Sequence, residues 1–283
     1  MTIISIRDTL RRANQESWCV PLFNIFDAYG VDGIFEALEE KRAPTILGYY
    51  SGSFEQPNAG ALCGYIQTRF KNSSVPVSLM LDHGASFEQC VKAMRYGFTD
   101  VMYDGSQLPL EDNIRNTRLV VQAAHAVGVS VEAELGHVGL GKEYDVYGGK
   151  RLGFTDPNLV ERFVEETGID SLAIAFGNAH GLYYGEPRLD LDLLYTVHQR
   201  VNIPIVMHGG TGLVDDQYRQ VVAAGIAKIN LATVILQEAT RRMILESQRE
   251  NASMFSITTH IQGAYREQCS HFYDILGTTG RAQ

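Results

Sequence analysis

The sequence predicts an α/β fold: a single (β/α)8 TIM barrel with additional C-terminal helices. Short apolar runs rich in β-forming residues alternate with longer amphipathic segments, and about eight such runs occur along the chain. The chain has 283 residues, and a barrel of this type typically takes roughly 250. Because nothing in the sequence resembles a linker, we expect one domain over residues 1–283.

The expected strands are nearly all apolar, as parallel strands covered on both faces are. Repeated strand–helix units suit a closed barrel, and no GxGxxG motif follows the first strand, which weakens a dinucleotide-binding alternative. The strands are expected at Cys19–Ile25, Ala43–Tyr49, Val75–Leu81, Asp100–Tyr103, Ser130–Leu135, Ser171–Phe176, Ile203–Met207 and Ala227–Leu231.

The segments between the strands carry helix start and stop signals. Glu111–Val127 places its apolar residues on one broad face and is followed by a glycine. Pro157–Thr167 follows Asp156, which we expect to be the N-cap before a proline at the first helical position. Further helices are expected at Asp215–Ala224 and, after the last strand, at Val234–Glu250 and His260–Leu276.

The net charge of −9 argues against nucleic acid as a partner, because affinity there comes mostly from cations that neutralise phosphates. A small phosphorylated substrate remains compatible, since barrels bind phosphate through backbone N–H groups and helix ends. No apolar run is long enough for a membrane span, and the N-terminus lacks the pattern of a secretory signal.

The cysteines are widely spaced and form no CxxC pair. This usage is typical of buried free thiols in a reducing compartment and not of a disulfide framework. We therefore expect a cytoplasmic protein. The four residues are Cys19, Cys63, Cys90 and Cys269.

Polar side chains follow the expected strands, at the end where barrel enzymes place their catalytic residues. Three histidines stand at three such ends: His83, His180 and His208. Neutral imidazoles on separate strands make a three-ligand zinc site with one open position, the arrangement of a catalytic zinc. Each histidine alone is equally typical of a hydrogen-bonded strand end, but the three together, beside glycines and carboxylates, favour a metal site.

Two glycine-rich or helix-leading segments follow the seventh and eighth strands. His208–Gly212 reads HGGTG, and Asn230–Thr233 leads into the next helix. Backbone N–H groups in such places bind anions, and these two loops are the usual phosphate cradle of barrels. Tight-turn chemistry alone is the alternative explanation for the glycines.

At these residues the sequence resembles the class II, metal-dependent ketose-bisphosphate aldolases, most closely the tagatose-bisphosphate aldolase branch. The similarity runs from about Phe23-Asn24 to Thr233. Its strongest motifs are Leu81-Asp82-His83-Gly84, Asp104-Gly105-Ser106, Val131-Glu132-Ala133-Glu134-Leu135-Gly136, His180-Gly181, His208-Gly209-Gly210 and Lys228-Ile229-Asn230-Leu231-Ala232-Thr233.

The resemblance implies that His83, His180 and His208 hold a catalytic Zn²⁺, and that Asp82 moves the proton on the C4 oxygen. Asp104 and Glu134 match carboxylates that bind a second or displaced divalent metal in some members. A monovalent cation, Na⁺ or K⁺, is also implied near the phosphate. The implied substrate-binding residues are Asn24, Gly181, Gly209, Gly210, Thr211, Asn230, Leu231, Ala232 and Thr233.

The resemblance further implies cleavage or formation of the C3–C4 bond of a phosphorylated ketose, either tagatose or fructose 1,6-bisphosphate or a related ketose 1-phosphate, to give dihydroxyacetone phosphate and an aldehyde. Zinc on the C2 oxygen would stabilise the enediolate as a Lewis acid, so no Schiff-base lysine is required. Lys228 begins the eighth strand and leaves a lysine mechanism open. A homodimer or homotetramer is expected by analogy with the family.

The sequence departs from the family at several places. The catalytic glutamate of the loop after the fifth strand, proposed to take the C3 proton, is best matched by Glu143, one position late. Tyr49 and Tyr50 stand where relatives have a small residue and a serine next to the substrate, and Thr211 replaces a serine. The distal phosphate often meets an arginine from a neighbouring subunit, for which Arg266 and Arg281 are available.

Three alternatives stay open at this stage. One is an aldolase for a deoxy-keto-sugar-acid phosphate. The second is a zinc-dependent sugar-phosphate isomerase or epimerase, which would use the same enediolate without releasing a triose. The third is a non-catalytic barrel that serves as an assembly partner, which the intact pair of Asp82 and His83 argues against.

Overall fold

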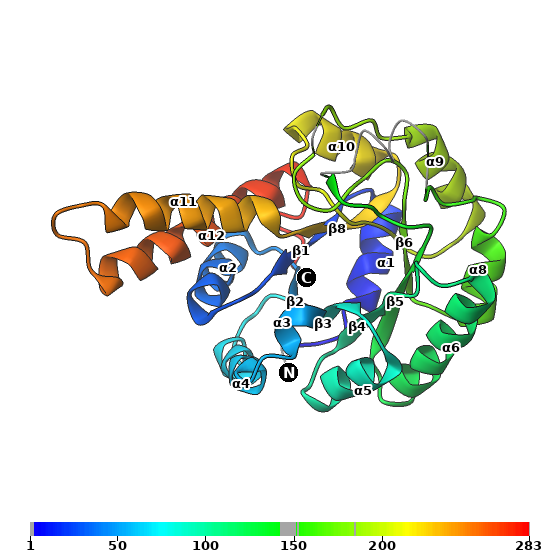
Figure 1. Ribbon diagram of the computed structural model, residues 1–283, viewed down its shortest axis with the longest axis horizontal. Coiled ribbons are helices and arrows are strands. Elements are labelled where there is room, and N and C mark those ends of the chain that lie inside the picture. Colours follow the sequence, from blue (N-terminus) through cyan, green and yellow to red (C-terminus); the bar gives the residue numbers. More distant parts are fainter. Residues whose placement is uncertain (1–2, 142–150, 152, 184, 283) are drawn as a thin grey trace.

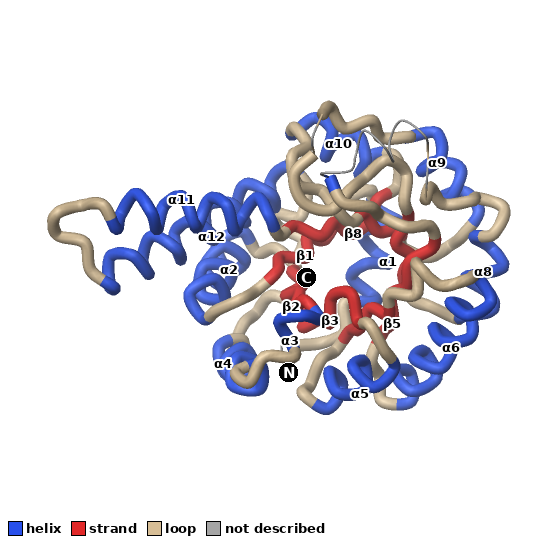
Figure 2. Tube along the Cα trace, viewed as in Figure 1, coloured by secondary structure: helices blue, strands red, loops and turns tan. Residues whose placement is uncertain are grey.

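The computed structural model describes residues 3–141, 151, 153–183 and 185–282. Eight parallel strands close into a barrel in chain order, with β8 pairing back to β1. This confirms the predicted TIM barrel, and Figure 2 shows the ring of strands inside a ring of helices. The strands are β1 (Val20–Asn24), β2 (Thr45–Tyr50), β3 (Val77–Gly84), β4 (Asp100–Tyr103), β5 (Ser130–Leu135), β6 (Ser171–Ile174), β7 (Ile205–Met207) and β8 (Ile226–Leu231).

Helices cover the outside of the barrel, and two more follow the last strand (Figure 1). They are α1 (Arg7–Glu16), α2 (Ala28–Lys41), α3 (Ser51–Phe54), α4 (Ala59–Arg69), α5 (Phe87–Arg95), α6 (Leu110–Ala126), α8 (Val160–Thr167), α9 (Leu191–Arg200), α10 (Asp215–Ala223), α11 (Thr233–Ser247) and α12 (Met254–Ile275).

Two predicted helix starts were wrong. α8 begins at Val160, because Asp156 accepts a hydrogen bond from the backbone N–H of Asn158 and forms a separate turn before the helix. α12 begins at Met254, six residues before the predicted start, because the Ser253 side chain accepts from the Ser256 backbone N–H and caps the first turn.

The bottom of the barrel is closed by α1, which lies within the ring of strands in Figure 1. Its residues Leu10 and Ala13 share a buried apolar cluster with residues of β1, β2, β3, β4 and β8. Asp100, at the start of β4, accepts hydrogen bonds from the backbone N–H of Ile6 and from Ser78 and Ser130. The end at which the strands begin is therefore covered, and the opposite end, where the strands finish, carries the loops that lead into the helices. All four cysteines are buried and free, as predicted.

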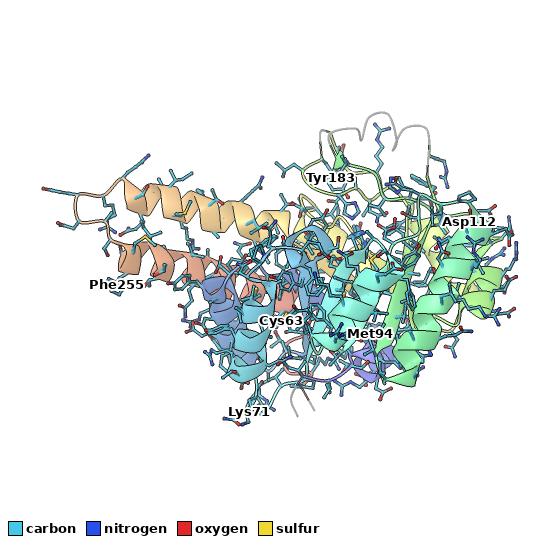
Figure 3. All side chains as sticks on the ribbon, turned by 60° about the horizontal axis from the view of Figure 1, so that its bottom comes forward. Cys63, Lys71, Met94, Asp112, Tyr183 and Phe255 are labelled. Carbon is cyan, nitrogen blue, oxygen red and sulfur yellow. The ribbon has the colours of Figure 1, made fainter. Side chains whose placement is uncertain are left out.

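Helices α11 and α12 form an arm that extends away from the barrel (Figure 1). Met254 and Phe255 are 70% and 87% exposed, and Phe255 lies near the tip of the arm in Figure 3. The other end of α12 packs on α2, which anchors the arm to the barrel. In the described part of the chain, no helix has the length and apolar character needed to cross a membrane.

Replacing Gly33 with alanine is expected to destabilise the fold by about 1–3 kcal/mol. Gly33 lies where α2 meets α12, and an added Cβ would overlap the carbonyl oxygen of Gln262 and lie 2.7 Å from Tyr265 Cβ. Urea unfolding measures the change. Gly64→Ala in α4 is the matched control, since its Cβ would meet nothing within 4 Å. Equal stability of the two variants would contradict this packing.

Candidate active site

A cavity of about 830 Å³ opens at the carboxyl ends of the barrel strands. Most of the site residues predicted from the sequence line it, as does His137, while His208 is fully buried next to it. The predicted residues in the lining are Asn24, Asp82, His83, Asp104, Glu134, His180, Gly181, Gly209, Thr211, Asn230, Ala232 and Thr233.

Asp82 and His83 both reach this cavity although they are neighbours on one strand. Successive side chains of a regular strand point to opposite faces. The pairing of β3 with β4 shifts register between Leu81 and Gly84, and His83 adopts φ 56°, in the left-handed region. This irregular end of β3 turns the imidazole of His83 toward the same cavity as Asp82, at the cost of backbone strain.

Each of the three imidazoles uses one ring nitrogen for a protein partner. His83 Nδ1 lies 2.7 Å from Asp104 Oδ2, His180 Nδ1 lies 3.2 Å from the Val138 carbonyl oxygen, and His208 Nε2 lies 2.9 Å from Glu132 Oε1. A ring nitrogen that donates to such an acceptor fixes the tautomer and leaves the other nitrogen as a metal donor.

The second ring nitrogens of these histidines are suitable ligands for a metal ion. His180 Nε2 and His208 Nδ1 are buried without a hydrogen-bond partner. One ligand atom from each of the three histidines can be chosen so that all lie within 4.8 Å of one another. A second group meets the same criterion and shares one member, His83, with Asp104 and Glu134. The donor set of three imidazoles suits zinc, and the second set suits a second or displaced divalent ion.

The pKa values of His180 and His208 are shifted in opposite directions. Burial, together with the charges of His83 and His208, lowers the pKa of His180 to about 4. Burial opposes protonation of His208 as well, but its contacts with Glu132 and Glu134 outweigh burial and raise its pKa to about 9. His180 is thus neutral, whereas His208 sits between two carboxylates that attract any cation, a proton or a metal ion alike.

Asp82 is held by amides from the first and last strands. Asn24 Nδ2 on β1 donates to Asp82 Oδ2 at 2.7 Å, and Asn230 Nδ2 on β8 donates to Asp82 Oδ1 at 2.9 Å. Burial disfavours the charged carboxylate, yet the neighbouring histidines, the Asn24 donor and Lys228 lower its pKa overall. Asn24 and Asn230, predicted to bind substrate, therefore orient the carboxylate that faces the cavity.

A buried ion pair beneath the cavity was missed as functional by sequence reasoning. Glu132 Oε2 lies 2.9 Å from Lys228 Nζ, which also donates to Asn230 Oδ1 at 2.7 Å. Burial opposes ionisation of Glu132, but Lys228 and His208 lower its pKa to about 2. A hydrogen-bond network thus connects His208 to Asp82 through Glu132, Lys228 and Asn230. The available signal was the charged residues inside apolar strands, Glu132 and Glu134 in β5 and Lys228 in β8, since residues two apart on a strand share one face.

Lys228 is fully buried, and the described lining of the cavity does not include it. A Schiff-base lysine must reach the substrate carbonyl, so the lysine mechanism left open by the sequence has no geometric support here.

The loops after β6, β7 and β8 line the cavity with backbone. Gly209 has φ 70°, and a side chain there would overlap the Ala179 carbonyl oxygen. Tyr183 ties these loops together, because its hydroxyl accepts from the Ala179 N–H and donates to the Gly209 carbonyl. α11 begins at Thr233 with no side-chain cap, so its first N–H groups are available to an anion.

Several predicted residues lie elsewhere. Glu143 falls outside the described residues. The Leu231 side chain is buried in the barrel core, and Gly210 is not among the described lining residues. Tyr49 stacks on Phe98 in the core, so only Tyr50 borders the cavity. Both candidate arginines are ion-paired away from the cavity, Arg266 with Glu40 and Arg281 with Glu16.

A (β/α)8 barrel that gathers candidate metal ligands around a buried carboxylate has the makeup of a barrel enzyme. The sequence profile of the family "Fructose-bisphosphate aldolase class-II" matches residues 4–281. The fructose-bisphosphate aldolase of Geobacillus stearothermophilus is 40% identical over 253 residues, which cover 86% of each chain. That of Staphylococcus aureus (strain Mu50) is 36% identical over 294 aligned positions, which cover both chains completely.

Solved structures agree with this relationship. The crystal structure of the YdjI aldolase from Escherichia coli K12 has a TM-score of 0.89 and 30% identity, covering 99% of this chain and 100% of that one. The fructose-bisphosphate aldolase of Campylobacter jejuni shares the fold, with a TM-score of 0.81 at 20% identity, covering 98% and 96%. The chain belongs to the class II fructose-bisphosphate aldolase family. It is an aldolase, and therefore a lyase, and the family is generally metal-dependent.

Proposed function

We propose that this aldolase is zinc-dependent and cleaves or forms the C3–C4 bond of a phosphorylated ketose, with dihydroxyacetone phosphate as one product. The observation that carries the proposal is the convergence of three imidazoles beside the buried Asp82. Each imidazole uses one ring nitrogen for a protein partner, and the second nitrogens of His180 and His208 are buried without a hydrogen-bond partner. The names of the relatives support fructose 1,6-bisphosphate as the first substrate to test.

His83, His180 and His208 hold the metal in this proposal. Bound zinc supplies Lewis-acid stabilisation of the negative charge that develops as the C3–C4 bond breaks. Asp82, held by Asn24 and Asn230, accepts the C4 hydroxyl proton while the C3–C4 electron pair moves to C3 and the aldehyde leaves.

The loop backbone at Gly181 and Gly209–Thr211, with the first turn of α11, would bind the phosphate of the dihydroxyacetone half. Of the residues predicted to contact substrate, Gly210 and Leu231 would contribute backbone groups only. Transfer of the C3 proton by Glu143 stays a prediction.

A coupled assay for dihydroxyacetone phosphate across ketose phosphates and keto-sugar-acid phosphates tests the proposal. Cleavage is expected to stop when a chelator removes the metal and to return when Zn²⁺ is restored, because the charge that develops at C3 would otherwise lack its Lewis acid. Full cleavage activity in chelated protein with no bound metal would contradict it. An isomerised sugar without any triose would instead identify an isomerase or epimerase.

The expectations about further metal ions, cellular location, oligomeric state and domain number stay predictions, and different structural features support them. The group of His83, Asp104 and Glu134 supports a second divalent ion, and we keep the monovalent cation as a proposal. The buried free cysteines support a cytoplasmic location. The exposed apolar tip of the arm supports a homodimer or homotetramer. One domain over residues 1–283 is likewise retained.

A further inference from the structure

Lys228 lies beneath the cavity between two hydrogen-bond acceptors. Its Nζ is 2.9 Å from Glu132 Oε2 and 2.7 Å from Asn230 Oδ1. The side chain is fully buried, whereas Asn230, two positions further along the same face of β8, lines the cavity. A side chain buried this completely does not touch a ligand in the cavity, so any effect that Lys228 has on the reaction must pass through a neighbour.

The ammonium group of Lys228 determines which way the Asn230 amide faces. An ammonium donates hydrogen bonds and accepts none, so the atom that it meets on Asn230 must be the carbonyl oxygen. The amide nitrogen then points away from the lysine, and it donates to Asp82 Oδ1 at 2.9 Å. Lys228 therefore fixes Asn230 as a donor toward Asp82.

The direction of this amide matters because the hydrogen-bonding capacity of Asp82 changes during the proposed reaction. As a carboxylate Asp82 only accepts, but once it holds the C4 hydroxyl proton it can also donate. An amide that is free to turn could then present Oδ1 to Asp82 and draw the proton away from the cavity. Since Lys228 occupies Oδ1, Asn230 stays a donor and the proton stays available to the C4 oxygen.

Glu132 anchors the lysine and also contacts a proposed metal ligand. Glu132 Oε1 lies 2.9 Å from His208 Nε2, while its other oxygen pairs with Lys228. His208 has a second carboxylate neighbour, because its Nδ1 lies 3.4 Å from Glu134 Oε2. Loss of Lys228 would leave His208 with both carboxylates, so we expect the proposed metal site to keep its ligands.

We infer that Lys228 is a positioning residue: by binding Asn230 Oδ1 it keeps the Asn230 amide a donor to Asp82, and so holds Asp82 in place to serve the C4 oxygen. Lys228 then acts on cleavage of the C3–C4 bond without binding the metal or the substrate. This inference rests on the proposed function, which assigns the C4 proton to Asp82. It also gives a reason why a buried ion pair, which is costly to desolvate, lies directly beneath the site.

Lys228→Met tests the inference, because methionine is a flexible side chain with no charge and no donor. In the zinc-loaded protein we expect kcat for cleavage of fructose 1,6-bisphosphate to fall about 10- to 100-fold, as misplacement of a catalytic group by about 1 Å can do. KM should change much less, and zinc should stay bound. Lys41→Met is the matched control, since it removes a lysine that pairs with Asp274 between α2 and α12, and it should change none of these values.

Exchange of the C3 proton of dihydroxyacetone phosphate with deuterated water, followed by NMR without any aldehyde, is the second measurement. The exchange involves no C4 oxygen, so in Lys228→Met it should fall much less than cleavage does. A general loss of structure would lower both reactions alike.

A second background shows whether Lys228 acts through Asn230. Asn230→Ala removes the amide, so Lys228→Met should lower kcat there by no more than about twofold, which is the scatter between independent sites. A purely structural contribution would give the same fold loss in both backgrounds. If Lys228→Met does not fold on its own, the comparison is made with Glu132→Gln present throughout, because no buried carboxylate is then left without its lysine.

Four results would overturn the inference and leave the proposed function standing. They are an unchanged kcat in Lys228→Met, an equal fold loss of kcat in both backgrounds, a loss of exchange as large as the loss of cleavage, and a loss of bound zinc. Absence of exchange in the unaltered zinc-loaded protein would instead overturn the proposed function itself.

Discussion

Replacing His208 with alanine is expected to remove both bound zinc and aldol cleavage. His208 Nδ1 is a buried nitrogen without a partner, beside Glu134 Oε2 at 3.4 Å. Its loss deletes one of three ligands. Lewis-acid stabilisation is worth several kcal/mol and about 1.4 kcal/mol corresponds to tenfold, so kcat should fall by about 10³-fold or more. Elemental analysis of the purified protein and the dihydroxyacetone phosphate assay measure the two losses.

Two further variants make this result interpretable. His180→Ala is expected to show the same losses with a smaller effect on stability, because its ring bonds only to the Val138 carbonyl, whereas His208 also neutralises Glu132. His125→Ala removes an imidazole that pairs with Asp170 on the outside of the barrel, and it should change neither zinc content nor activity. Stoichiometric zinc in folded His208→Ala would contradict the ligand assignment.

Changing Asp82 to asparagine is expected to lower kcat for cleavage by about 10²–10⁴-fold while zinc stays bound. The substitution keeps the shape of the side chain but removes its ability to accept the C4 hydroxyl proton. One amide donor, Asn24 or Asn230, would then face another donor, so a small rearrangement is also expected. Steady-state kinetics and zinc content measure these effects.

Proton exchange at C3 of dihydroxyacetone phosphate sharpens this second prediction. The exchange involves no C4 oxygen, so it should fall much less than cleavage does in Asp82→Asn. An equal loss of both reactions would show that Asp82 acts on the metal site and not on the C4 oxygen. Asp112→Asn is the control, because Asp112 pairs with Arg115 on the surface of α6.

The strand ends predicted from the sequence alone located much of the candidate site. Eight apolar runs had to close into a barrel, and parallel strands bring their carboxyl ends to one face, so His83, His180 and His208 were placed together correctly. The predicted helix boundaries were less accurate where the hydrogen bonds of short polar side chains set the first residue of a helix. Asp156 capped a turn instead of a helix, and Ser253 began a helix earlier than the apolar pattern indicated.

Other features depend on contacts between distant segments and could not be predicted. The orientation of Asp82 by Asn24 and Asn230 requires the pairing of the first strand with the last, which no local pattern encodes. The left-handed backbone of His83 arises from a register shift between β3 and β4. Tyr49 and Tyr50 looked equivalent in the sequence, but alternation along β2 sends Tyr49 into the core and Tyr50 to the cavity.

The two amides on Asp82 also carry a consequence for biosynthesis. One comes from β1, near the start of the chain, and the other from β8, which the ribosome releases more than two hundred residues later. Until β8 emerges and pairs with β1, Asp82 lacks one of its donors, and Lys228 has not reached Glu132. A nascent chain would therefore contain all three histidines proposed as metal ligands before Asp82, the proposed acid/base, has both of its donors, and we expect activity only after β8 pairs with β1.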